Sequence, residues 1–242
     1  MNGLREEAGR TARPSDVKGI STNRLWPVAL LGAAVMALLG ASASADGGSR
    51  GTPSPTGIAD GEGLTPDEKI AALERWEVVT AVKPTVGGGR HRVRADAICN
   101  APGELVKSVL LDVRGYEKFM PKVTRSRVLK SDGAKMQVLI ETRLPWPIEN
   151  SWNILKVAVA PAGKEGWSIT WDRVTGSMKE NNGFWLLSPY GENTRLAYEI
   201  EVYVPPVLPD FAVDRGFRKV AADYVNALRN EVKRRREAGA SL

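Results

Sequence analysis

Two side chains of this sequence could supply the thiol nucleophile or the imidazole base that many enzyme mechanisms use. The 242-residue chain contains one cysteine, Cys99, and one histidine, His91. A zinc site built from three or four Cys and His ligands is therefore excluded within one chain, and so is a disulfide scaffold. Mechanisms of the Ser-His-Asp or Cys-His kind would have to use His91, because they need an imidazole beside the nucleophile. We expect no metal and no cofactor.

The surroundings of these two residues argue against catalysis. His91 lies between Arg90 and Arg92, and no nucleophile is close in the sequence. Cys99 alternates with small apolar residues, so it is expected to face the interior as a buried side chain. The sequence predicts a protein without enzymatic activity.

Arg173 is the polar side chain best placed to meet a ligand. It shares a strand face with Ile169 and Trp171, whereas alternation puts Glu141 and Arg143 in solvent. A cation inside an apolar cavity must be paired or must meet a ligand carboxylate, phosphate or carbonyl, because an unpaired buried charge is very costly. The alternative is that Arg173 ends its strand in water.

Large aromatic and apolar residues supply the rest of the candidate site. Flat rings offer apolar area and hydrogen-bonding tips that can orient a ligand, although such residues also serve as ordinary core. Alternation places residues 136–142 and 196–202 on strands with one apolar face each, which should point inward. The predicted ligand-binding residues are Met136, Ile140, Trp171, Arg173, Trp185, Tyr198, Ile200, Phe217 and Tyr224.

The elements that must position these residues begin with a short helix and a hairpin. Thr65 and Glu68 have the spacing of a capping box, which predicts a helix that ends near Glu74. Near-alternation of apolar residues then predicts two strands, at residues 76–82 and 90–98, joined through glycines as a hairpin.

The rest of the chain reads as one helix, a meander of strands and a last helix. Apolar spacings of three and four predict a helix from Pro102 to about Gly115. Strands are expected at residues 123–129, 134–144, 151–159, 167–174, 183–187 and 194–204. Their short connections imply antiparallel pairing, and a single apolar stripe predicts a long helix over residues 213–238.

These elements predict an α+β fold in which a curved antiparallel sheet of seven or eight strands surrounds the long C-terminal helix. The last helix is the remaining element long enough to lie across several strands. A curved sheet wrapped around a helix leaves space between them, and a ligand would bind there.

The N-terminus has the pattern of an export signal. Basic residues precede an apolar run from Leu25 to Leu39, and small residues follow it up to Ala45. We expect residues 1–45 to be a signal peptide cleaved after Ala45, which makes the protein periplasmic or secreted. The alternative is an uncleaved membrane anchor. Residues 46–64 are rich in Gly, Ser and Pro and are expected to be a flexible linker before a ligand-binding domain at 65–242.

The charge of the chain is only mildly basic. Removal of residues 1–45 would take away five basic and three acidic residues and lower the net charge from +6 to +4. The sequence lacks the concentrated basic stripe that would indicate nucleic-acid binding. The cluster from Lys233 to Arg236 could contact anionic lipid headgroups, but cations near a helix C-terminus are also favoured by the helix dipole.

Several stretches, taken in order, resemble the START-like or SRPBCC superfamily, whose fold is called helix-grip. The resemblance covers roughly residues 76–236. It rests on residues 101–106, Asp112, Tyr116, Met120-Pro121, 144–147, 183–189, 194–198 and the Pro-rich loop before the last helix. Among its branches the chain looks most like bacterial lipid-transfer START domains and the polyketide cyclase or coenzyme Q-binding proteins.

The resemblance implies a deep apolar cavity that holds a lipid, sterol, quinone or polyketide-like molecule. The favoured hypothesis is an exported, monomeric binding or transfer protein for a hydrophobic small molecule. One alternative is a cyclase or dehydratase, which would need a pair of convergent acid and base groups in the cavity. Another is an interaction module whose cavity is filled by its own side chains.

Overall fold

The computed structural model describes residues 57–84, 89–143, 150–203 and 210–239. Its strands are β1 (Ile58–Asp60), β2 (Val78–Pro84), β3 (Arg90–Cys99), β4 (Val123–Asp132), β5 (Lys135–Thr142), β6 (Ser151–Pro161), β7 (Trp167–Gly176), β8 (Asn181–Tyr190) and β9 (Asn193–Tyr203). Its helices are α2 (Pro66–Glu74), α3 (Gly103–Leu111), the 3-10 turn η2 (Val113–Gly115), α4 (Tyr116–Phe119) and α5 (Asp210–Gly239). The predicted α+β class is confirmed.

In this described part of the chain, nine strands form one sheet in the order β1-β2-β3-β9-β8-β7-β6-β5-β4. The predicted meander is confirmed from β4 to β9, and β9 then pairs antiparallel with β3. Tight turns close the hairpins: Gly133 and Gly191 have φ values of 55° and 59°, which glycine adopts without a steric penalty.

The strand count exceeds the predicted seven or eight because β1 was not expected. It pairs parallel with β2 inside the segment predicted to be a flexible linker. Arg218 of α5 reaches this segment, with Nη1 at 2.6 Å from Asp60 and Nη2 at 3.1 Å from Glu62. Residues 57–64 are therefore part of the fold, and the linker prediction was wrong for them.

The helix α2 starts as its capping box predicts. The Glu68 backbone N–H donates to the Thr65 hydroxyl, and the Thr65 backbone N–H donates to the Glu68 carboxylate at 2.8 Å. Lys69 ties the helix to β3 through the buried carboxylate of Asp96 at 2.7 Å. Burial alone would raise the pKa of Asp96, but hydrogen bonds from Arg94 and Lys69 outweigh it and lower that pKa.

The helix predicted from Pro102 to Gly115 is shorter than expected. It ends at Leu111, where Asp112 leaves helical geometry with φ −78° and ψ 60°, and η2 and α4 follow. The Tyr116 hydroxyl donates to the Leu110 carbonyl at 2.5 Å and holds this corner. Burial raises the pKa of that hydroxyl.

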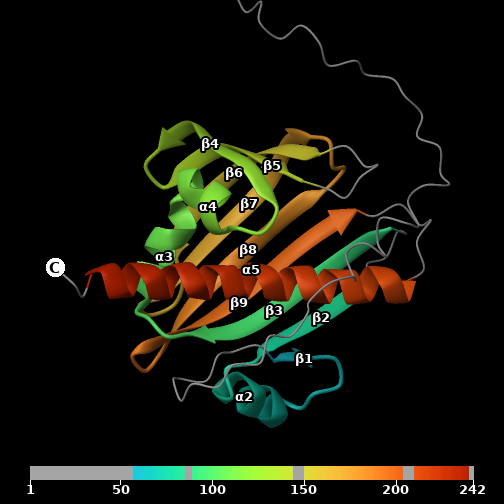
Figure 1. Cartoon of the computed structure of the whole chain (residues 1–242), viewed down its shortest axis with the longest axis vertical. Helices are drawn as coiled ribbons and strands as arrows, with labels where there is room; N and C mark the ends of the chain where they lie inside the picture. Colours follow the sequence, from blue (N-terminus) through green and yellow to red (C-terminus); the bar gives the residue numbers. More distant parts are fainter. Residues whose placement is uncertain (1–56, 85–88, 144–149, 204–209, 240–242) are drawn as a thin grey trace, which may run out of the picture.

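The long helix α5 crosses one face of the sheet, as Figure 1 shows. Its backbone comes closest to β2, β3 and α3. The main core lies between α5 and the sheet, and a smaller cluster lies under α2 on the other face. Among the described residues, no helix combines the length and apolar character needed to cross a bilayer.

Some sequence predictions fall outside the described residues. These are the signal peptide at 1–45, its cleavage after Ala45, the first part of the linker, the motif at 144–147 and the Pro-rich loop before α5. They stay predictions.

Candidate functional site

Strand register places the predicted sheet residues on the inner face, toward α5. Trp171 of β7 pairs with Val157 of β6, and Arg173 pairs with Leu155. Val157 and Leu155 belong to the buried core, so Trp171 and Arg173 face the interior as well. The same pairing places Met136, Ile140, Trp185, Tyr198 and Ile200 inside.

Four aromatic rings meet at this face. Tyr198 lies at the centre, with ring centroids 4.5 Å from Trp185 and 5.9 Å from Trp171. Tyr224 of α5 completes the group from the helix side, at 6.2 Å from Tyr198. The structure therefore brings together four of the nine predicted residues in one cluster.

A glycine lets the ring of Trp171 lie flat against the next strand. Gly183 of β8 pairs with Trp171, and a Cβ at Gly183 would lie 2.4 Å from that ring and 2.2 Å from the Glu199 carbonyl oxygen. The indole Nε1 of Trp171 donates to Asn181 Oδ1 at 3.0 Å. This bond fixes the ring while its faces remain apolar.

The interior under α5 has two unlike parts. The aliphatic half comprises the fully buried residues Val106, Val109, Leu187, Leu196, Val225, Leu228 and Val232. The aromatic half comprises Met136, Ile140, Trp171, Trp185, Tyr198, Ile200, Phe217 and Tyr224. Six of these eight side chains remain partly exposed although they face the interior; Trp185 and Tyr198 are buried. Incomplete cover over apolar rings is the property expected of a binding surface.

The tyrosines of the aromatic half are neutral at physiological pH. Burial raises the pKa of the Tyr198 and Tyr224 hydroxyls above the ordinary value for tyrosine. They can donate or accept hydrogen bonds, but they cannot act as phenolate bases near pH 7.

The polar end of the aromatic half contains Arg173. Its Nη2 donates to the Gly176 carbonyl at 2.9 Å, and its backbone N–H donates to Asn182 Oδ1 at 2.9 Å. Its Nε is buried without a hydrogen-bond partner within the described residues, and so is Oδ1 of Asn153 on the neighbouring strand. Arg173 is therefore an inward-facing cation, although the side chain is partly exposed rather than fully enclosed.

His91 and Cys99 take the places expected of them. His91 contacts Phe217 of α5, with ring centroids 5.8 Å apart. Cys99 is 2% exposed, and burial raises the pKa of its thiol to about 11, so the thiolate is scarce near pH 7. The prediction of a small buried cysteine is confirmed.

Of the two charged residues predicted to lie in solvent, Arg143 is exposed, whereas Glu141 is half-buried. Glu141 pairs with Arg125 at 3.2 Å on the outer face. Within the described part of the chain, no group of three or more His, Cys, Asp or Glu side chains could hold a metal ion.

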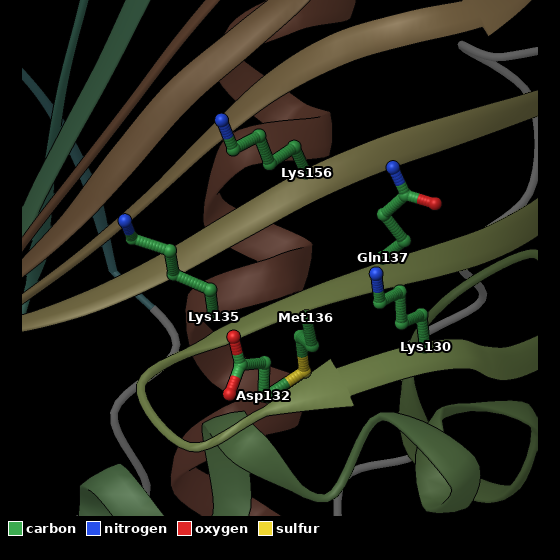
Figure 2. Close-up of a pocket in the computed structure, with 6 residues that line it drawn as sticks. All are labelled: Lys130, Asp132, Lys135, Met136, Gln137 and Lys156. Atoms are coloured by element: carbon green, nitrogen blue, oxygen red, sulfur yellow. The ribbon is translucent and has the colours of Figure 1, made fainter.

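A small open pocket lies on the β4–β5 hairpin and β6 (Figure 2), and it shares only Met136 with the aromatic half. It is lined by Lys130, Asp132, Lys135, Met136, Gln137 and Lys156, and its volume is about 150 Å³. Sites for small organic ligands usually exceed about 300 Å³ and are mainly apolar. We therefore do not assign the ligand to this pocket.

Sequence reasoning missed three residues of the site: Asn153, Asn181 and Gly183. Each is polar or lacks a side chain inside an apolar strand pattern. A glycine within a strand often marks a close approach by another group, which was the available signal for Gly183. The two asparagines gave no comparable signal, because alternation does not say which polar residue turns inward.

Comparison with known proteins agrees with this geometry. Residues 99–229 match the family model described as polyketide cyclase / dehydrase and lipid transport, so the chain belongs to that family. The predicted START-like membership is confirmed. No curated protein matches the chain by sequence.

Solved structures share the fold at low sequence identity. A STAR-related lipid transfer protein from Xanthomonas axonopodis is 18% identical, with a TM-score of 0.58 over 64% of this chain and 93% of that one. Human STARD10 is 16% identical, with a TM-score of 0.55 over 74% and 84%. The Zhui aromatase/cyclase from Streptomyces is 19% identical, with a TM-score of 0.50 over 60% and 95%.

Proposed function

We propose that this chain is an exported, non-enzymatic binding or transfer protein for a hydrophobic small molecule such as a lipid, sterol or quinone. The ligand lies between the inner sheet face and the part of α5 that carries Phe217 and Tyr224. The observation that carries the proposal is the incomplete cover of the aromatic half, next to an aliphatic half that is fully buried.

The driving force is the removal of apolar surface from water. Burial of apolar area gains about 25 cal/mol per Å², and both the ligand and the partly exposed side chains of the aromatic half contribute such area. Because α5 comes closest to β2 and β3, its backbone lies farther from β5 to β8, and inward side chains such as Trp171 and Trp185 lie on the face of those strands. Side chains can adjust to a guest more readily than a packed backbone.

Relatives support this class of function. The family description includes lipid transport, and the Xanthomonas structure is that of a STAR-related lipid transfer protein.

A second candidate is a cyclase or dehydratase acting on a polyketide-like substrate. The family description and the similarity to an aromatase/cyclase favour it. Against it, no carboxylate is among the residues that define the aromatic half; the polar groups beside or within it are Arg173, two neutral tyrosines and His91, which contacts Phe217. An enzyme would convert an enolisable substrate, whereas a carrier would release it unchanged.

Native mass spectrometry of the protein mixed with a bacterial lipid extract tests the proposal. We expect an apolar molecule bound to the wild type and lost in Ile140→Trp, which adds bulk to the inner face. Leu139→Trp is the matched control, because Leu139 is the neighbour on the outer face of β5 and is also partly exposed. Absence of any bound molecule in the folded wild type would contradict the proposal.

Export is a separate part of the proposal. It depends on the charged leader, the apolar run and the small residues before Asp46. We expect the mature protein to begin at Asp46 in the periplasm or medium. N-terminal sequencing of the protein from those fractions checks this, and an intact leader in the membrane fraction would indicate an anchor instead.

Membrane contact through the basic C-terminus is the weakest part, because much of that cluster is engaged within the protein. Arg234 and Arg235 bind Glu231, Arg235 also binds Asp112 at 2.6 Å, and Arg236 donates to Asn100. These contacts favour a structural role for the cluster.

A further inference from the structure

Two buried polar atoms on neighbouring strands have complementary chemistry and no hydrogen-bond partner among the residues that the structure describes. Nε of Arg173 on β7 is a hydrogen-bond donor, and Oδ1 of Asn153 on β6 is an acceptor. Asn153 is 3% exposed, so water does not readily replace a missing partner. Buried polar groups are nearly always paired, because an unpaired one loses its hydrogen bonds to water without replacement.

The two groups converge on the same glycine. Gly176 pairs with Asn153, and its carbonyl oxygen accepts from Arg173 Nη2 at 2.9 Å. A Cβ at Gly176 would lie 2.6 Å from Asn153 Oδ1 and 2.4 Å from the Trp152 carbonyl. The close approach of both side chains to Gly176 places the free donor and the free acceptor at one end of the aromatic half.

Nearby polar groups do not satisfy this pair. Asn181 accepts from Trp171, Asn182 accepts from the Arg173 backbone, and Glu180 binds Arg90 through Oε1, while its buried Oε2 has no partner among the described residues. Within the described residues, no carboxylate forms an ion pair with Arg173. A bound ligand is therefore one source of a group that satisfies the pair.

We propose that Arg173 and Asn153 bind the hydroxyl group of an amphiphilic ligand whose apolar part lies on the aromatic half. A hydroxyl oxygen accepts from Nε–H while its proton is donated to Oδ1, so both groups are paired at once. A carboxylate or phosphate dianion would satisfy Arg173 but would turn acceptor oxygens toward Asn153. The ligand class is thus a long-chain or polycyclic alcohol. This inference rests on the proposed function.

The test compares the binding of 1-decanol, decyl methyl ether and decanoate. Binding is measured through the fluorescence of Trp171 and Trp185. We expect 1-decanol to bind about five- to tenfold more tightly than the ether, since the ether has no proton for Asn153. Decanoate should bind no more tightly than the alcohol.

Variants assign the preference to the two residues. Asn153→Leu should bind the alcohol and the ether equally, and Arg173→Met should weaken both. Arg173→Lys, which keeps the charge but lacks Nε–H, is a second variant in case Arg173→Met is unstable. Arg127→Met is the matched control, because Arg127 is exposed on the outer face of β4, and it should behave as the wild type.

The outcomes separate the two proposals. Equal binding of alcohol and ether by the wild type, or tighter binding of decanoate, would overturn the hydroxyl assignment and leave the proposed function standing. Retention of the preference in both the Asn153 and the Arg173 variants would also overturn the assignment. If neither the alcohol nor the ether binds the folded protein, the proposed function fails, and this inference fails with it.

Discussion

The aromatic and aliphatic halves of the interior lie under the same helix but are held differently. Around the aliphatic half, α5 is fastened by Arg229, whose guanidinium donates to the Ile98 carbonyl at 2.8 Å and the Trp76 carbonyl at 3.2 Å. Burial lowers the pKa of Arg229 to about 10, so it stays charged at neutral pH. The hydrogen bonds of Arg229 therefore hold this part of α5 against the rest of the fold.

The first part of α5 depends on a more exposed set of contacts. Arg218 joins Asp60, Glu62 and Asp214, all with substantially exposed carboxylates, and donates to the Thr80 carbonyl at 2.9 Å. Exposed ion pairs contribute little stability each. The difference indicates that α5 is held more firmly around Arg229 than around Arg218.

The largest expected effect is the loss of a side chain from the aliphatic half. Leu228→Ala should lower the free energy of unfolding by about 3 kcal/mol, because Leu228 is fully buried and its removal leaves a cavity. Phe217→Ala, in the aromatic half, should cost only about 1 kcal/mol, since that ring is partly exposed. Urea unfolding of both variants measures the contrast.

Equal losses in these two variants would remove the distinction between the halves. Measurements of ligand binding give a second contrast between the aromatic and aliphatic halves. Phe217→Ala should weaken the binding of 1-decanol, whereas Leu228→Ala should leave it unchanged at temperatures where the variant is folded.

A methyl group on Gly183 should disturb the aromatic half from the sheet side. Gly183→Ala is expected to cost about 2 kcal/mol and to displace the Trp171 ring, because the added Cβ would overlap both that ring and a backbone carbonyl oxygen. Near-ultraviolet circular dichroism and thermal unfolding check this. Gly216→Ala is the control, since a Cβ there meets no atom within 4 Å.

Removal of the Arg218 contacts should loosen only one end of α5. Arg218→Ala is expected to raise amide hydrogen exchange about tenfold in residues 210–220, with little change in residues 225–236. Lys219→Ala removes an exposed pair with Asp223 and serves as control. A uniform increase along the whole helix would show that α5 opens as one unit.

The smallest expected effect concerns Glu231, at the anchored end. Hydrogen bonds from Arg234 and Arg235 outweigh burial and lower its pKa from 4.5 to about 2. The ionised form therefore stabilises the fold fully above pH 4.5, and this contribution is lost as the pH falls toward 2.

Glu231→Gln should consequently cost about 1 kcal/mol at pH 7, a modest value because Arg234 is largely in solvent. The difference from the wild type should shrink steadily below pH 4.5 in unfolding measurements. Glu192→Gln, in an exposed turn, should show no such trend. A difference that is constant with pH would contradict the assigned pKa.

Much of the fold could be predicted because it depends on local patterns. Each of these patterns lies within a short stretch of sequence: the capping box at Thr65, the alternation in the strands and the apolar stripe of α5. The inward orientation of Arg173 followed from the same alternation, since it is two residues from Trp171.

The remainder depends on contacts between distant segments. The strand Ile58–Asp60 is three residues long and exists because β2 and Arg218 bind it, which no local pattern reveals. The unpaired state of Asn153 likewise requires knowledge of its neighbours in space. The inward-facing Arg173 could be predicted from the sequence, but the unpaired Asn153 on the neighbouring strand could not.

The most direct test locates a bound ligand relative to the tryptophans. Trp171 lies in the aromatic half, whereas Trp167 lies at the other end of β7, where its Nε1 donates to Glu104 of α3 at 2.8 Å. Bromine quenches indole fluorescence at short range, so 10-bromo-1-decanol reports which tryptophan it touches. We predict quenching that persists in Trp167→Phe and disappears in a Trp171→Phe, Trp185→Phe double variant. Quenching that instead persists in the double variant and vanishes in Trp167→Phe would contradict a ligand site in the aromatic half.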